Sequence, residues 1–153
     1  RERLAIDLKT PAGVEQVLVD RFTRTRRPVE GLETAAMQIG LFDRLSPSAQ
    51  DHMVLATLDD APHAQDEARQ LVRAWAHGDL TGIARAADAE LSQTPELEET
   101  LVVARNRAWV AAIDHQLDRP GTVLVAVGVG HLVGADALTT MLRARGITVS
   151  RIQ

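Results

Sequence analysis

The feature that most constrains the fold is the apolar run Thr-Val-Leu-Val-Ala-Val at residues 122–127. A run without polar interruption predicts a strand that is buried on both faces, as in the middle of a parallel sheet covered by helices. The following residues predict a helix that Gly146 closes, and then a last strand over residues 147–152. The chain is therefore expected to end in a right-handed β-α-β unit.

Most of the remaining sequence has the apolar spacing of amphipathic helices. Helices are expected over residues 13–27, 34–45, 47–58, 63–78 and 95–117, with Thr34 as an N-cap and Gly78 as a stop signal. Only residues 27–33 offer a further strand. The sequence thus predicts an α/β fold, a single domain over residues 1–153 in which a small, mainly parallel sheet carries a large helical insertion at about 46–118. Three strands make a small sheet for this length, so we expect an N-terminally truncated fragment.

Composition excludes several classes of protein. The net charge is −4 and only 3% of residues are aromatic, which disfavours nucleic-acid binding. No apolar run approaches the roughly 20 residues of a membrane span. The chain has no cysteine, so a thiolate nucleophile and a cysteine-ligated zinc are also excluded.

The glycines that follow residues 122–127 allow two interpretations. Their spacing, Gly128-x-Gly130-x-x-x-Gly134, is close to that of a dinucleotide-binding loop. A dinucleotide site needs a second half of the sheet, which we do not expect after Arg151, and His131 would occupy the space that a phosphate requires. We favour the second interpretation, in which the glycines form a turn that presents His131. A helix N-terminus just after it would favour the neutral imidazole, which binds metal or accepts a proton.

Two other polar residues point to the same place. Glu33 lies at the end of the predicted strand 27–33, and His131 follows the strand 122–127, so parallel strands would bring both to one edge of the sheet. Arg105 lies within the apolar arc of the helix 95–117, where an unpaired guanidinium is very unfavourable and an anionic partner is expected. The simpler alternatives are a carboxylate that stabilises the N-terminus of helix 34–45 and an arginine that extends to solvent.

Three stretches that contain these residues resemble the TraB/GumN family, whose animal members are the Tiki proteins. They are "GLETAAMQIGLFDRL" (31–45), "LVVARNRAWVAAI" (101–113) and "GTVLVAVGVGHLVGADALTTMLRARGITVSRI" (121–152). The resemblance implies an α/β fold like that of the erythromycin esterases and ChaN-like proteins, and an extracytoplasmic location. The Gly-Val-Gly-His sequence is similar to the second Gly-x-x-His motif of the family. The first Gly-x-x-His motif has no counterpart before Glu33.

The resemblance implies a metal-dependent, peptidase-like hydrolase. Its catalytic residues would be Glu33, Arg105 and His131, with Gln38 and Asn106 supporting them. A divalent ion (Mn²⁺, Co²⁺ or Zn²⁺) would be held by His131 and Glu33, although Glu33 could equally act as general base. Because one histidine of the family is missing, we expect weak metal binding and no hydrolysis by this chain alone. The alternative is a non-enzymatic module that binds a ligand or partner in the same crevice.

Overall fold

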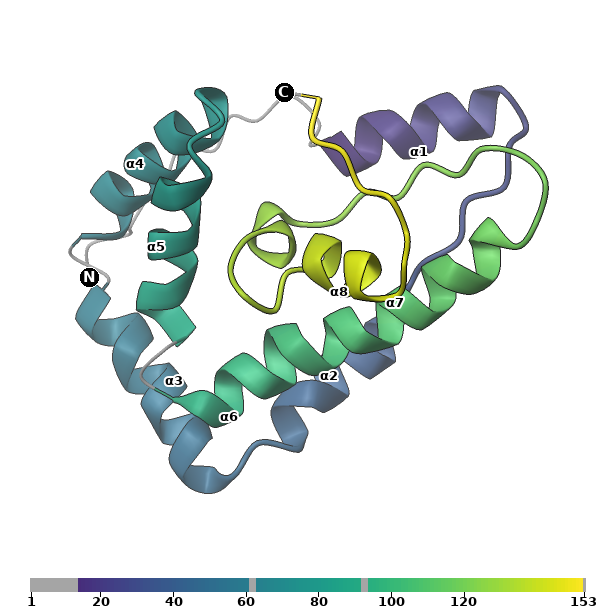
Figure 1. Ribbon diagram of the computed structural model, residues 1–153. Coiled ribbons are helices and arrows are strands. Elements are labelled where there is room, and N and C mark those ends of the chain that lie inside the picture. The colour runs from purple at the N-terminus through teal and green to yellow at the C-terminus, as the bar shows by residue number, and fades with distance from the viewer. Residues whose placement is uncertain (1–13, 61–62, 92–93, 153) are drawn as a thin grey trace. The chain divides into compact units, whose positions relative to one another are not determined.

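The computed structural model describes residues 14–60, 63–91 and 94–152 (Figure 1). The chain divides into two compact units. The first unit, Arg1–Leu32, contains helix α1 (Val14–Arg24) and the irregular residues 27–31. The second unit, Glu33–Gln153, holds every candidate site residue. Within the described ranges, no helix is both long enough and apolar enough to cross a bilayer.

The second unit is built from short helices. They are α2 (Ala35–Asp43), α3 (Pro47–Asp60), α4 (Ala64–Ala76), α5 (Leu80–Leu91), α6 (Pro95–Glu98), the π-helical η1 (Glu99–Val103), α7 (Ala104–Leu117), the 3₁₀ turn η2 (Val129–Leu132) and α8 (Leu138–Ala144). The helices predicted at 34–45, 47–58, 63–78 and 95–117 are confirmed. Their local signals act as expected. The Thr34 side chain accepts a hydrogen bond from Met37 N at 3.1 Å, and Gly78 ends α4 with a φ of 66°.

The predicted α/β fold is wrong, because the described residues form helices and irregular segments but no strand. Residues 27–33, 122–127 and 147–152 have no regular secondary structure. The apolar run is also exposed rather than buried, with Val123 at 49% and Leu124 at 57% of full exposure. A strand exists only when a second segment pairs with its backbone, and none of the described segments pairs with these residues. An apolar run indicates that a segment favours the conformation of a buried strand, but it does not show whether another strand is present to pair with it.

A small buried cluster packs the start of α3 against α6. Leu45, Ala49 and Leu97 form its core, and the Ser46 backbone N–H and hydroxyl donate to the two carboxylate oxygens of Glu96 at 2.7 and 2.6 Å. The Ser46 hydroxyl also accepts from Ala49 N at 3.2 Å, which caps α3. These contacts therefore hold the end of α2 beside α6. The beginning of α2, which follows Glu33, lies near α7.

The π-helical segment η1 changes which face of the long helix is buried. A continuous α-helix would have buried the alanines 104, 108 and 112, but these are exposed. The extra residue of the π turn moves the buried face to Val103, Asn106, Trp109, Val110 and Ile113. Arg105 lies beside this face, at the point where α7 begins. The π turn thus helps to set the direction in which Arg105 points.

Residues 125–127 do not close onto the helices beside them. A cavity of about 300 Å³ remains between this segment, α7, η2 and α8. Its walls are almost entirely apolar, formed by Ile113, Val125, Ala126, Val127, Leu132, Leu138, Thr139 and Leu142. The predicted strand therefore forms one wall of an open apolar cavity.

Candidate functional site

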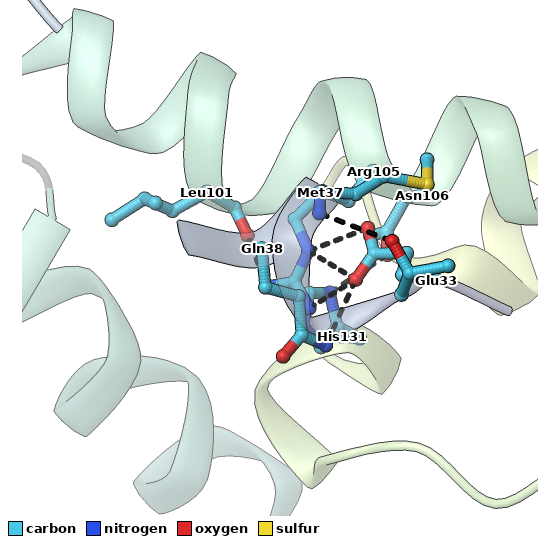
Figure 2. A network of polar contacts seen from close by, with 8 residues as sticks. Glu33, Met37, Gln38, Leu101, Arg105, Asn106 and His131 are labelled. Carbon is cyan, nitrogen blue, oxygen red and sulfur yellow. Dashed lines mark hydrogen bonds and ion pairs between the residues drawn. The ribbon is translucent and has the colours of Figure 1, made fainter. Parts of the chain in front are cut away.

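The centre of the candidate site is an ion pair between Glu33 and Arg105 (Figure 2). Arg105 Nε donates to Glu33 Oε1 at 2.9 Å, and Arg105 Nη2 donates to Glu33 Oε2 at 2.8 Å. The side chains are only 20% exposed for Arg105 and 8% exposed for Glu33. The prediction that Arg105 is largely buried against a carboxylate is confirmed. Two parallel hydrogen bonds to a carboxylate are the strongest arrangement that a guanidinium offers.

Neighbouring groups fix both members of the pair. Gln38, one turn into α2, donates from Nε2 to Glu33 Oε2 at 3.1 Å. Arg105 Nη1 donates to the Leu101 carbonyl oxygen at 3.0 Å, across the junction of η1 and α7. Both carboxylate oxygens are thus hydrogen-bonded, and three of the five guanidinium N–H groups have acceptors. The two remaining N–H groups, one on Nη1 and one on Nη2, have no acceptor among the described residues.

The indole ring of Trp109 contacts both Arg105 and His131. The Arg105 guanidinium lies 4.8 Å from the centre of the indole ring, and the His131 ring centroid lies 4.4 Å from it at an interplanar angle of 53°. Trp109 is 5% exposed, and its indole N–H group has no hydrogen-bond partner among the described residues. The sequence placed Trp109 only in the apolar core. Its spacing of four residues from Arg105 on one helix is the signal that could have indicated this contact.

His131 is held by a neighbour of the ion pair rather than by the ion pair itself. Its Nδ1 lies 2.8 Å from Oδ1 of Asn106, and Asn106 Nδ2 donates to the Asp136 carbonyl oxygen at 2.8 Å. The His131 backbone N–H donates to the Gly128 carbonyl oxygen at 3.0 Å within η2. The α7 helix and the 128–136 loop therefore meet through Asn106, which is completely buried.

The environment favours an ionised Glu33 and a neutral His131. The hydrogen bonds from Arg105 lower the pKa of Glu33 below its ordinary value of 4.5, burial opposes this effect, and the Gln38 hydrogen bond adds to the lowering. Burial lowers the pKa of His131, the charge of Arg105 lowers it further, and the Glu33 carboxylate partly opposes both. A helix N-terminus was the expected cause for His131, but α8 begins only at Leu138.

The turn at residues 128–134 requires fewer glycines than the sequence suggested. Gly134 has a φ of 85°, which a residue with a side chain rarely adopts. Gly130 has open space where a Cβ would lie, and a Cβ on Gly128 would meet His131 Cδ2 at an ordinary contact distance of 3.9 Å. In this structure, Gly134 alone of the three requires glycine.

The described residues do not make a metal site by themselves. No cluster of three or more histidine, cysteine, aspartate or glutamate side chains occurs within the described ranges. Glu33 is engaged by Arg105 and Gln38, and His131 Nε2 is the one histidine nitrogen of the site without a hydrogen-bond partner among the described residues. The described histidines outside the site, 52, 63, 77 and 115, are exposed. One open ligand does not fit a divalent ion, which needs several.

Comparison with known proteins identifies the family. A model of the TraB/PrgY/gumN family matches residues 2–151, nearly the whole chain. The resemblance predicted from the sequence is therefore confirmed at the level of the family. No curated protein and no solved structure matches the chain.

Proposed function

Because the chain belongs to the TraB/PrgY/gumN family, we propose that it supplies Glu33, Arg105 and His131 to a hydrolase site that acts on a peptide-like carbonyl substrate. The observation that carries this proposal is the arrangement of an ionised carboxylate, a buried guanidinium and a neutral imidazole around Trp109. Buried groups whose pKa values are shifted by specific neighbours are typical of catalytic sites.

The proposed chemistry is attack of water on a carbonyl carbon. His131 Nε2 takes the proton of the attacking water, and the developing oxyanion is stabilised by the two N–H groups of Arg105 that have no acceptor. The imidazolium then gives its proton to the departing amine as the C–N bond breaks. Glu33 holds the guanidinium in place through two hydrogen bonds, so we assign it an orienting role. Its engagement by Arg105 and Gln38 argues against use as a metal ligand or as general base.

We further propose, as a second form of the reaction, a hydrolysis that depends on a divalent metal ion. If a divalent ion takes part, His131 Nε2 would be one of its ligands and could not also act as the general base. The other ligands would come from outside the described residues. We therefore expect weak binding of Mn²⁺, Co²⁺ and Zn²⁺ by this chain, measured by titration calorimetry. Tight stoichiometric binding that His131→Ala abolishes would show that the ligand set is complete here.

The direct test is hydrolysis of a quenched-fluorescent peptide library, measured with and without Mn²⁺, Co²⁺ or Zn²⁺. Turnover should be lost in His131→Ala and retained in His115→Ala, because His115 is an exposed histidine on α7. The assay should be run on the longest natural form of the protein that contains this sequence, beside residues 1–153. Turnover that survives His131→Ala would refute the assignment.

A binding module is the second candidate, and one observation favours it. Both oxygens of Glu33 are hydrogen-bonded, so the ion pair is already closed and resembles a structural contact. Arg105 could then present its two remaining N–H groups to an anionic or carbonyl group of a ligand without any reaction. Peptide binding without turnover under every metal condition would establish this alternative.

A further inference from the structure

We propose that Asn106 is a positioning residue that holds His131 in the tautomer with its proton on Nδ1 and its lone pair on Nε2. The proposal deepens the proposed function, and it rests on that function only for the use that Nε2 has in the reaction. The tautomer itself follows from the hydrogen bonds around Asn106.

The orientation of the Asn106 amide is fixed by a backbone carbonyl. The Asp136 carbonyl oxygen, 2.8 Å away, can only accept a hydrogen bond, so the amide nitrogen of Asn106 must face it. The reverse orientation would place two oxygen acceptors in contact inside the protein. Asn106 is completely buried, and no solvent is available to relieve such a contact. Oδ1 of Asn106 therefore faces His131.

The fixed amide determines which nitrogen of His131 carries the proton. Oδ1 lies 2.8 Å from Nδ1, and an amide oxygen can only accept, so Nδ1 must donate. A neutral imidazole with a proton on Nδ1 has its lone pair on Nε2. Nε2 has no hydrogen-bond partner among the described residues, and it is not sealed from solvent as the Trp109 nitrogen is. The open lone pair thus lies on the atom that can reach a ligand.

Free histidine in water prefers the opposite tautomer, with its proton on Nε2. In that form the lone pair on Nδ1 would face the Asn106 oxygen, and Nε2 could neither accept a proton nor bind a metal. Asn106 thus plays the part that a carbonyl or carboxylate often plays behind a metal-bound or catalytic histidine. Its contribution to the proposed reaction is indirect, because it acts through His131.

The experiment is a long-range ¹H–¹⁵N correlation spectrum of the ¹⁵N-labelled chain at a pH where histidines are neutral. His131 should show a pyrrole-like Nδ1 and a pyridine-like Nε2. His77 is an internal reference, because its Nδ1 lies 2.8 Å from the Arg73 carbonyl oxygen and must also carry the proton. His52, which is exposed and lies on another helix, should show the mixture of free histidine.

Two variants separate positioning from mere packing. In Asn106→Leu, His131 should revert toward the Nε2-protonated form, whereas the His77 signals should stay unchanged. Asn106→Asp keeps an acceptor for Nδ1 but places a second oxygen against the Asp136 carbonyl, so it should be less stable than the wild type. Its folded form should keep the His131 proton on Nδ1. If either variant fails to fold, the wild-type spectrum still decides the question, because a His131 protonated on Nε2 would overturn the proposal.

The proposal is overturned by a wild-type His131 protonated on Nε2, or by an unchanged His131 tautomer in a folded Asn106→Leu variant. Neither result depends on turnover. A chain with the expected tautomer and no hydrolytic activity would leave this inference standing while the hydrolase proposal fails. Turnover with the opposite tautomer would do the reverse.

Discussion

The site around Trp109 and the segment 122–127 belong to the same compact unit but are organised in opposite ways. In the site, charged and polar groups are largely buried and nearly all have partners, such as Glu33 with Arg105 and Asn106 with His131. In the segment, apolar side chains are exposed, and no described residue hydrogen-bonds to the backbone. The comparison shows that the site is held together by polar contacts within this chain, whereas no described residue pairs with the backbone of the segment.

The largest expected effect is on the ion pair of the site. Arg105→Ala should lower the free energy of unfolding by about 3 kcal/mol, because it leaves the Glu33 carboxylate buried without its counter-charge. Arg107→Ala is the matched control, since Arg107 is 60% exposed and pairs with a 51% exposed Glu99. Its effect should stay below about 0.5 kcal/mol. Equal effects in urea denaturation would show that Arg105 makes only a surface contact.

The pH dependence of stability should report the same pair. The folded-state pKa of Glu33 is lowered, so its contribution is fully present above the ordinary value of 4.5 and is lost as the pH falls through the lower folded value. The stability difference between wild type and Glu33→Gln should therefore shrink from about pH 6 to about pH 3. Glu99→Gln should show a small difference throughout. A wild-type advantage over Glu33→Gln that does not change with pH would contradict this explanation.

His131 should act in the same direction but over a higher range of pH. Its folded pKa is lowered, so the unfolded chain binds the proton more readily, and stability falls as the pH drops below the ordinary histidine value of 6.5. Arg105 and Glu33 are the charged groups that act on it. His131→Gln should remove this part of the slope, as measured by thermal unfolding between about pH 7 and about pH 5. A slope that His131→Gln leaves intact would contradict the assignment.

Substitutions in the glycine turn at residues 128–134 should have a smaller effect on the free energy of unfolding. Gly134→Ala should destabilise the chain by about 1–2 kcal/mol, because alanine must adopt a positive φ there. Gly130→Ala, which meets open space and no positive φ, should change the free energy of unfolding by less than about 0.5 kcal/mol. Similar effects of the two substitutions would mean that the turn does not have the conformation described here.

The segment 122–127 should influence association more than folding. An exposed apolar segment with an unpaired backbone recruits other chains, so we expect the chain to associate with a second copy as its concentration rises. Leu124→Lys should reduce this association in sedimentation velocity, while changing the free energy of unfolding by less than about 0.5 kcal/mol. The control is Leu117→Lys, at a similarly exposed leucine on α7. A wild-type chain that is monomeric at every concentration would contradict the expectation.

The parts of the molecule that the sequence predicted are those that depend on local chemistry. The Thr34 cap and the Gly78 stop each act within one turn of a helix, and both are where they were expected. The Arg105 partner was also predictable, because a guanidinium among apolar residues requires an anion. The route by which Glu33 arrives was predicted incorrectly, since it comes from the residue before the α2 cap and not from the end of a strand.

The features that the sequence did not predict depend on distant segments. Whether residues 122–127 form a strand depends on a pairing partner, which no local pattern reveals. The π turn at Glu99–Val103 has no clear sequence signal, yet it shifts the buried face by one residue and leaves the alanines 104, 108 and 112 exposed. The resemblance implied a supporting role for Asn106, but the orientation of its amide depends on the Asp136 carbonyl, 30 residues away, which no local pattern indicates.

Hydrogen–deuterium exchange of a dilute sample tests the contrast between the two regions most directly, because one experiment reports on both. The amides of residues 123–127 should exchange at the earliest time point, since no described residue accepts a hydrogen bond from them. The amides of Trp109, Val110 and Ile113, within α7 and buried, should be strongly protected. Slow exchange of residues 123–127 in a monomer, or early exchange of the α7 amides, would contradict the account.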